Sequence, residues 1–187
     1  MFLMQSFNPE IKTFSTLDST NDYLKQNYLF LPDHTICQAL AQTKGRGRRG
    51  TSWESEAGKN LLFSVLFKEY LDPIQLMRLA GSTLLEILAE KEIQAIFKMP
   101  NDIWVNGKKI AGLLIESIYG ETCEATILGI GLNVNQRSFV TQNATSVWLE
   151  TNTETKIEDW LARFLKEFIN EKRITGHNRF DQKIGNF

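Results

Sequence analysis

The chain has 187 residues, of which 42% are hydrophobic and 23% are charged, so it can form one globular domain over residues 1–187 with a sizeable core. A formal net charge of −1 argues against a general nucleic-acid binder, and no apolar run has the length of a membrane span or the pattern of a signal peptide. Cys37 and Cys123 lack the spacing of a zinc site or a disulfide framework, which predicts buried free thiols in a cytoplasmic protein.

The first half of the chain predicts one helix followed by two strands. Ser19 to Asp22 can cap a helix that runs to about residue 28. Residues 35–42 and 60–67 then have the pattern of strands, and the second is apolar enough to be buried on both faces. The segment between these strands is rich in glycine and arginine, and we expect a loop held between two core strands.

The second half predicts two amphipathic helices and a meander of strands. Apolar residues recur at helical spacing from residue 72 to about 92. The predicted core positions of this helix are Ile74, Met77, Ala80, Leu84, Leu85 and Leu88. Residues 95–98 and 103–105 have the pattern of strands, and Asn106-Gly107 predicts a hairpin into a strand over 108–119. A strand over 122–131 completes an antiparallel meander, and residues 157–168 predict the second helix.

The segment Gly45–Gly50, which reads GRGRRG and is followed by Trp53, alternates glycine with guanidinium groups. Glycines let the backbone come close to a ligand, and arginines offer forked donors that suit carboxylates and phosphates. One interpretation is therefore a loop that closes around a small anion. The other is a solvated, flexible basic loop, and the motif alone does not decide between them.

The supply of residues disfavours several familiar catalytic sites. The sequence has two histidines, His34 and His177, and neither lies in a metal-binding or nucleophile motif. It also lacks a P-loop and a dinucleotide-binding fingerprint. What remains is a set of polar residues at element ends, each with a structural alternative such as a cap, a turn or a solvated strand end. These candidates are Ser19, Thr20, Asn21, Gln42, Arg46, Arg48, Lys98, Asn101, Asp102, Lys109 and Asn133.

Five motifs follow one another between about residues 18 and 146: STN, GRGRRG with Trp53, KMPND, KIAGLLIE and GIGLNVN, with Ala144-Thr145-Ser146 after them. In this order they resemble the biotin protein ligase family. The resemblance implies ATP-dependent activation of biotin to biotinyl-5′-AMP and transfer to a lysine of a biotin carrier domain, typically that of acetyl-CoA carboxylase. It also implies an α+β fold, with a mixed, largely antiparallel β-sheet flanked by α-helices. Because the substrate carboxylate is itself the nucleophile, no nucleophilic side chain is required.

Matching motif positions imply roles for single residues. The implied biotin-binding residues are Ser19, Thr20, Asn21, Gln42, Arg46, Gly47, Arg48, Lys98, Gly112 and Gly129. The implied nucleotide-binding residues are Arg48, Arg49, Trp53, Lys98, Lys109 and Asn133. Lys98 is the predicted catalytic ammonium, between the biotin carboxylate and the α-phosphate, and Arg48 is a second catalytic cation. Gly131 joins Gly112 and Gly129 as a point of close backbone approach, whereas Asp102 receives no role. Mg²⁺ is expected from the ATP chemistry, without a protein metal site.

The chain departs from the family pattern in three places. Met99 stands where the family usually has tryptophan. Too few residues precede Ser19 for the N-terminal winged helix of DNA-binding members, and too few follow the last predicted helix for a small C-terminal β-barrel, the tail over 176–187 being polar. We therefore expect a single catalytic domain that binds neither DNA nor membranes, with a strand edge that could support a homodimer.

Three other functions are weighed against this expectation. A lipoate or octanoate ligase would share the fold and the adenylate chemistry, although GRGRRG and KMPND match the biotin branch better. A non-catalytic relative could keep the biotin pocket without completing transfer. An RNA-binding module is disfavoured by the net charge and by the lack of paired aromatic motifs.

Overall fold

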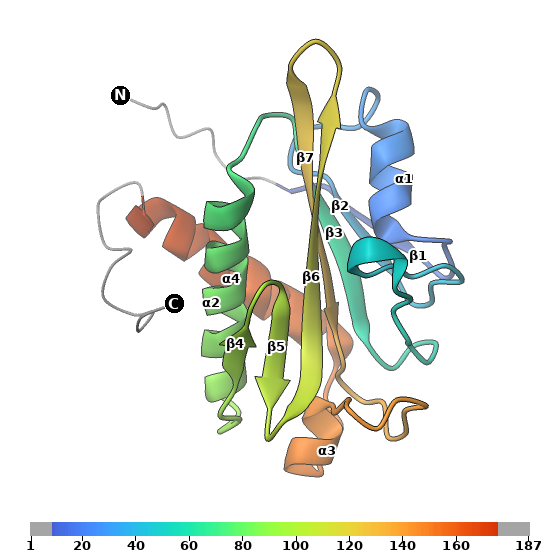
Figure 1. Ribbon diagram of the computed structural model, residues 1–187, viewed down its shortest axis with the longest axis vertical. Coiled ribbons are helices and arrows are strands. Elements are labelled where there is room, and N and C mark those ends of the chain that lie inside the picture. Colours follow the sequence, from blue (N-terminus) through green and yellow to red (C-terminus); the bar gives the residue numbers. More distant parts are fainter. Residues whose placement is uncertain (1–8, 176–187) are drawn as a thin grey trace.

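The computed structural model of the protein describes residues 9–175, and Figure 1 shows how their helices and strands are arranged. Residues 1–8, His177 and the rest of the predicted polar tail over 176–187 lie outside the described residues. In chain order the elements are β1 (Ile11–Phe14), α1 (Thr20–Asn27), β2 (Ile36–Ala39), the 3₁₀ turn η1 (Arg48–Gly50), β3 (Leu61–Phe67), α2 (Pro73–Ala89), β4 (Ile96–Lys98), β5 (Asp102–Val105), β6 (Lys108–Tyr119), β7 (Cys123–Leu132), α3 (Val147–Thr151) and α4 (Ile157–Thr175).

The strands form one sheet in the order β1-β2-β3-β7-β6-β5-β4. β1 pairs with β2 in parallel, and the other neighbouring pairs are antiparallel. The expected mixed, largely antiparallel sheet flanked by helices is therefore confirmed. Asn106 and Gly107 join β5 to β6 with φ values of 50° and 78°. Both values lie in the left-handed region, as a two-residue type I′ turn requires, so the predicted hairpin is confirmed.

The two faces of the sheet are covered differently (Figure 1). α2 and α4 pack against each other and against one face, where Phe63, Phe164 and Phe168 belong to the larger hydrophobic cluster. α1 lies on the other face against β2, β3 and β7, with Leu24 in a smaller cluster. Every residue of β3 is buried, as its apolar sequence predicts. Along β6 the second face, away from α2, carries the candidate site.

Helix α2 buries a different stripe from the one predicted. Ile74, predicted as core, is 64% exposed, and Met77 and Leu85 are only half-buried. Leu76 and Ile87 are buried in their place. Apolar side chains occupy more than one stripe of this helix, so spacing alone could not decide which stripe faces the sheet.

Besides the 3₁₀ turn η1, two elements have no counterpart among those predicted, β1 and the five-residue α3. Both are too short to give a clear periodicity, and β1 is held by its backbone pairing with β2. Cys37 is buried as predicted, whereas Cys123 is only half-buried. Burial raises the pKa of the Cys37 thiol to about 12. Within residues 9–175, no helix combines the length and the apolar character needed to cross a membrane.

Candidate active site

Three glycines on β6 and β7 let side chains from other elements lie directly on the sheet backbone. A methyl group at Gly112 would lie 2.9 Å from the Trp53 ring, and one at Gly131 would lie 2.6 Å from it. A methyl group at Gly129 would collide with the Asn21 side chain. The points predicted for close backbone approach therefore admit Trp53 and Asn21 in this structure.

A narrow cavity of about 40 Å³ lies where this glycine face, the start of α1 and the glycine–arginine loop meet. It has room for about three water molecules. Its lining brings together most of the predicted biotin-binding residues and two of the predicted nucleotide-binding residues. Those present are Ser19, Thr20, Asn21, Gln42, Arg46, Gly47, Gly112 and Gly129, with Trp53 and Lys109.

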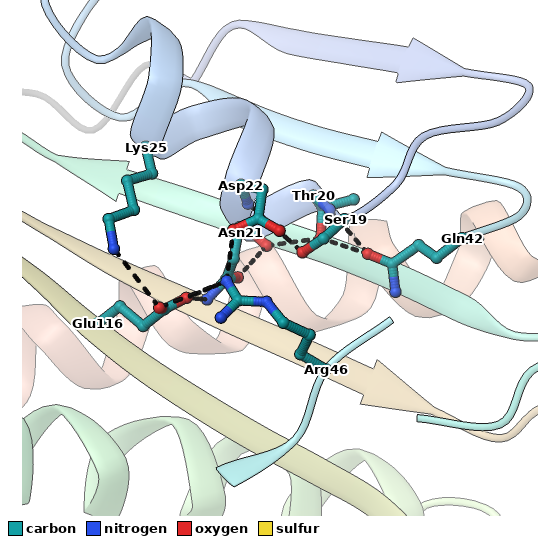
Figure 2. A network of polar contacts seen from close by, with 9 residues as sticks. Ser19, Thr20, Asn21, Asp22, Lys25, Gln42, Arg46 and Glu116 are labelled. Carbon is teal, nitrogen blue, oxygen red and sulfur yellow. Dashed lines mark hydrogen bonds and ion pairs between the residues drawn. The ribbon is translucent and has the colours of Figure 1, made fainter. Parts of the chain in front are cut away.

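The polar end of the cavity is a chain of hydrogen bonds that begins at α1 (Figure 2). The Thr20 N–H donates to Gln42 Oε1 at 2.7 Å, and Thr20 Oγ1 lies 3.1 Å from the same oxygen. Thr20 Oγ1 also lies 2.7 Å from Ser64 Oγ, which donates to Asn21 Oδ1 at 2.5 Å. Thr20, Asn21 and Ser64 are at most 4% exposed, so these bonds are shielded from water. Ser19 caps α1, as predicted.

Charged side chains close the outer side of this chain of hydrogen bonds. Asn21 Nδ2 donates to Glu116 Oε2 at 2.8 Å, and Arg46 Nη2 lies 3.2 Å from the same oxygen. Arg46 also forms an ion pair with Asp22, and Lys25 Nζ lies 4.0 Å from Glu116 Oε1. Figure 2 shows how these groups meet beside α1. The glycine–arginine loop is thus attached to β6 and α1 through one guanidinium.

Two lysines on this face each lie over a tryptophan ring. Lys109 Nζ is 5.2 Å from the Trp53 ring centroid and 2.7 Å from Asp102 Oδ1. Lys98 Nζ is 3.4 Å from the Trp104 ring centroid, which is cation–π geometry, and Lys98 does not line the cavity. Asp102, which received no role from the sequence, is the ion-pair partner of Lys109.

The motif after the last strand reaches the site through the backbone of Lys109. The Lys109 N–H donates to the Asn143 carbonyl at 2.8 Å, and its carbonyl accepts from the Thr145 N–H at 2.9 Å. Asn133 Nδ2 donates to the Thr145 carbonyl at 2.9 Å, and Asn133 is not among the residues that line the cavity. Asn133 Oδ1 and Trp53 Nε1 are buried without a hydrogen bond among the described residues. Such atoms are the kind that a ligand or water satisfies.

Two of the predicted arginines lie outside the narrow cavity. Arg49 sits in η1 with a φ of 53°. Arg48 lines a second, wider cavity of about 670 Å³, which α2 and the β4–β5 turn also line. Leu114 lines both cavities, so the two adjoin at β6.

The sequence did not single out Ser64 or Glu116, and it gave Asn101 as a candidate without a role. Ser64 is a single polar residue within the apolar strand LLFSVLF, which was the signal available for it. Glu116 lies four residues after Gly112 on the same strand, and the two-residue period of a strand puts both on one face. Asn101 also lines the cavity and holds β6, because its Nδ2 donates to the Leu113 carbonyl at 2.8 Å.

Comparison with known proteins identifies the family to which this chain belongs. Residues 13–133 match the Biotin/lipoate A/B protein ligase family. The chain belongs to this family. Among members of the Biotin/lipoate A/B protein ligase family, the Bifunctional ligase/repressor BirA of Escherichia coli K12 is 33% identical over 133 residues, which cover 68% of this chain and 41% of BirA. The Biotin--[acetyl-CoA-carboxylase] ligase of Mycobacterium tuberculosis is 33% identical over 112 residues, which cover 56% of this chain and 41% of that protein. The chain therefore spans less than half the length of these relatives.

Solved structures agree with this assignment to the ligase family. The biotin protein ligase of Aquifex aeolicus in complex with biotin and ATP superposes with a TM-score of 0.79 and 30% sequence identity. The match covers 90% of this chain and 72% of the Aquifex chain. The expected fold of a biotin ligase catalytic domain is thereby confirmed.

Proposed function

We propose that this chain joins the carboxylate of biotin to the α-phosphate of ATP and then passes the biotinyl group to a lysine of a carrier domain. The observation that carries the proposal is the cavity where the STN segment, the glycine–arginine loop and the KIAG segment meet. Family membership supports it, as does the likeness to an Aquifex enzyme whose structure holds biotin and ATP. By analogy with the mycobacterial relative, the proposed partner is the biotin carrier of acetyl-CoA carboxylase.

The proposed chemistry has two steps. In the first, a carboxylate oxygen of biotin attacks the α-phosphorus, the bond to the bridging oxygen of the β-phosphate breaks, and pyrophosphate leaves. In the second, the amine of the carrier lysine attacks the acyl carbon, AMP leaves, and the amine loses a proton. The chain's part is to position two anions and to neutralise the charge that develops between them.

Lys109 is the ammonium best placed for that part, because it lines the cavity between Trp53 and Asp102. Lys98, predicted for the same part from its motif, can reach the cavity only after leaving the Trp104 ring. We propose that Lys109 lies at the carboxylate and α-phosphate, and that Lys98 and Arg48 contribute charge from the wider cavity side. This division is supported by the lining of the two cavities, because Lys109 lines the narrow one and Arg48 the wider one, while Lys98 lies over the Trp104 ring.

Mg²⁺ belongs to the proposal through ATP. In the part of the chain that the structure describes, no three His, Cys, Asp or Glu side chains gather as a metal site. Asp102, the carboxylate nearest to Lys109, is engaged in its ion pair. The donor set therefore fits an ion carried mainly by phosphate oxygens and water, which would neutralise phosphate charge when bound.

The test is transfer of labelled biotin to a carrier domain in the presence of ATP and Mg²⁺. Lys109→Ala should lower kcat by about 10²–10³-fold, the usual loss when one donor to developing charge is removed. Lys98→Ala should lose less, and Lys156→Ala, at an exposed loop lysine, is the matched control. Loss in Lys98→Ala alone would return the central role to Lys98. No transfer by the wild-type chain would overturn the proposed function.

Lipoate is the second candidate substrate, because the family to which the chain belongs includes lipoate ligases by its description. Pyrophosphate release is measured with biotin and with lipoate in the same assay. Release of pyrophosphate with lipoate but not with biotin would identify lipoate as the substrate. Biotin binding without any AMP would instead identify a non-catalytic relative.

A further inference from the structure

We propose that Glu116 is a positioning residue of the biotin site, which fixes the direction of the buried hydrogen-bond chain by holding the side-chain amide of Asn21. The inference rests on the proposed function. Glu116 does not line the cavity and would not touch the reacting atoms. It acts through Asn21, whose side chain does line the cavity.

The surroundings of Glu116 constrain what its carboxylate can do. It projects from β6 beside α1, and its side chain is 19% exposed. The groups that face it are Asn21 Nδ2 at 2.8 Å, Arg46 Nη2 at 3.2 Å and Lys25 Nζ at 4.0 Å. Asp22 pairs with the same Arg46 guanidinium. All three groups that face Glu116 are hydrogen-bond donors, so the carboxylate acts toward each of them as an acceptor.

An ionised carboxylate can only accept, and this selects one of the two orientations of the Asn21 amide. Nδ2 must point to Glu116, so Oδ1 points to Ser64. The Ser64 hydroxyl then donates its one proton to Asn21 Oδ1, so Ser64 Oγ can only accept from Thr20 Oγ1. Thr20 has one hydroxyl proton, and Ser64 Oγ at 2.7 Å is nearer to Thr20 Oγ1 than Gln42 Oε1 at 3.1 Å, so we assign that proton to Ser64. Gln42 Oε1 is then held by the Thr20 N–H at 2.7 Å. Each hydroxyl in the chain therefore donates toward Glu116.

This direction determines what the cavity offers to a ligand. Thr20 Oγ1 keeps lone pairs free to accept, and Gln42 Nε2 makes no hydrogen bond within the described residues and can donate. A ureido ring carries two N–H donors and one carbonyl acceptor, which is the complementary set. If the Asn21 amide turned over, Ser64 would face a donor and the order of the chain would be lost.

Two substitutions separate amide positioning from charge. Glu116→Gln keeps an acceptor oxygen for Asn21 but removes the negative charge that faces Arg46 and Lys25. Glu116→Ala removes both. Glu121→Ala, at the exposed β6–β7 turn, is the matched control.

Titration calorimetry with biotin is the first measurement. We expect about tenfold weakening for Glu116→Ala, because the buried Asn21 amide loses its acceptor, and the 1.4 kcal/mol that corresponds to tenfold lies within the cost of leaving a buried donor unsatisfied. Glu116→Gln should stay within about threefold of the wild type, and Glu121→Ala should be unchanged. Where Glu116→Ala does not fold, Glu116→Met keeps the volume and lacks the acceptor.

The second measurement needs no ligand. Nuclear magnetic resonance should find the Asn21 side-chain N–H signals protected from exchange in the wild type and Glu116→Gln, but exposed to exchange in Glu116→Ala. Equal biotin affinities for wild type and Glu116→Ala would overturn the positioning role alone, and equal losses in both variants would assign the effect to charge and overturn it too. If the wild type binds no biotin, the proposed function and this role fall together.

Discussion

Gly131→Ala tests whether the Trp53 indole rests on the sheet backbone. The added methyl would lie 2.6 Å from Trp53 Cε2 and 3.0 Å from its Nε1, well inside the roughly 3.5–4.0 Å of an optimal carbon contact. The φ of Gly131 is not in the left-handed region, so no backbone strain is added. Overpacking of this kind costs about 1–3 kcal/mol. For a chain of this length, each 1 kcal/mol lowers Tm by about 2–4 °C, so we expect a fall of roughly 2–12 °C.

A double-mutant cycle isolates the contact. Thermal unfolding is followed by circular dichroism for the wild type, Gly131→Ala, Trp53→Ala and the double variant. Without the indole the methyl has space, so Gly131→Ala should cost less than about 0.5 kcal/mol in the Trp53→Ala background, and the coupling should reach about 0.5 kcal/mol or more. Additive effects of the two substitutions would refute the packing of Trp53 on Gly131.

Three further predictions concern other parts of the molecule. At pH 8 iodoacetamide should modify Cys123 but not Cys37 in the folded protein, because burial keeps the Cys37 thiol protonated. The modified cysteines are identified by mass spectrometry, and modification of Cys37 before the protein unfolds would contradict this prediction. Arg163→Leu should lower the urea midpoint of unfolding slightly at pH 7, because the hydrogen bond from Arg163 lowers the pKa of the exposed Glu90 carboxyl. That decrease should be fully present above the unfolded Glu90 pKa of 4.5 and vanish as pH falls through the depressed folded value, so a pH-independent difference in urea unfolding would be inconsistent with the pair. Residues 45–58 should gain hydrogen-exchange protection with biotin and ATP, and equal protection with and without them would rule out a closing loop.

The regular part of the fold could be predicted because its signals are local. Ser19 caps α1, the Asn106-Gly107 turn sets the β5–β6 hairpin, and the apolar run of β3 is buried on both faces. The buried stripe of α2 could not be predicted, because it depends on which side meets the sheet. Ile74, read as core, faces the wider cavity instead.

The sequence motifs predicted which residues meet at the site, but not how their side chains are placed relative to one another. The motif positions around Thr20, Gln42 and Arg46 meet at one cavity, as expected. The positions of Lys98 over Trp104 and of Lys109 over Trp53 could not be foreseen, because each depends on a tryptophan that is adjacent in space and not in sequence. The catalytic role given to Lys98 from its motif stays a prediction. Homodimerisation through a strand edge and the absence of DNA binding stay predictions.

Side chains along β6 alternate between the two faces of the sheet, and this limits where residues can be inserted or deleted. Gly112, Leu114 and Glu116 serve the ligand face, while the residues between them, Leu113 and Ile115, pack toward α2. Inserting or deleting one residue here would exchange the two sets, carrying the Glu116 carboxylate into the core and Leu113 and Ile115 onto the ligand face. Single-residue insertions and deletions should therefore be rejected along this strand, so that length variation among functional variants falls in the loops outside β6.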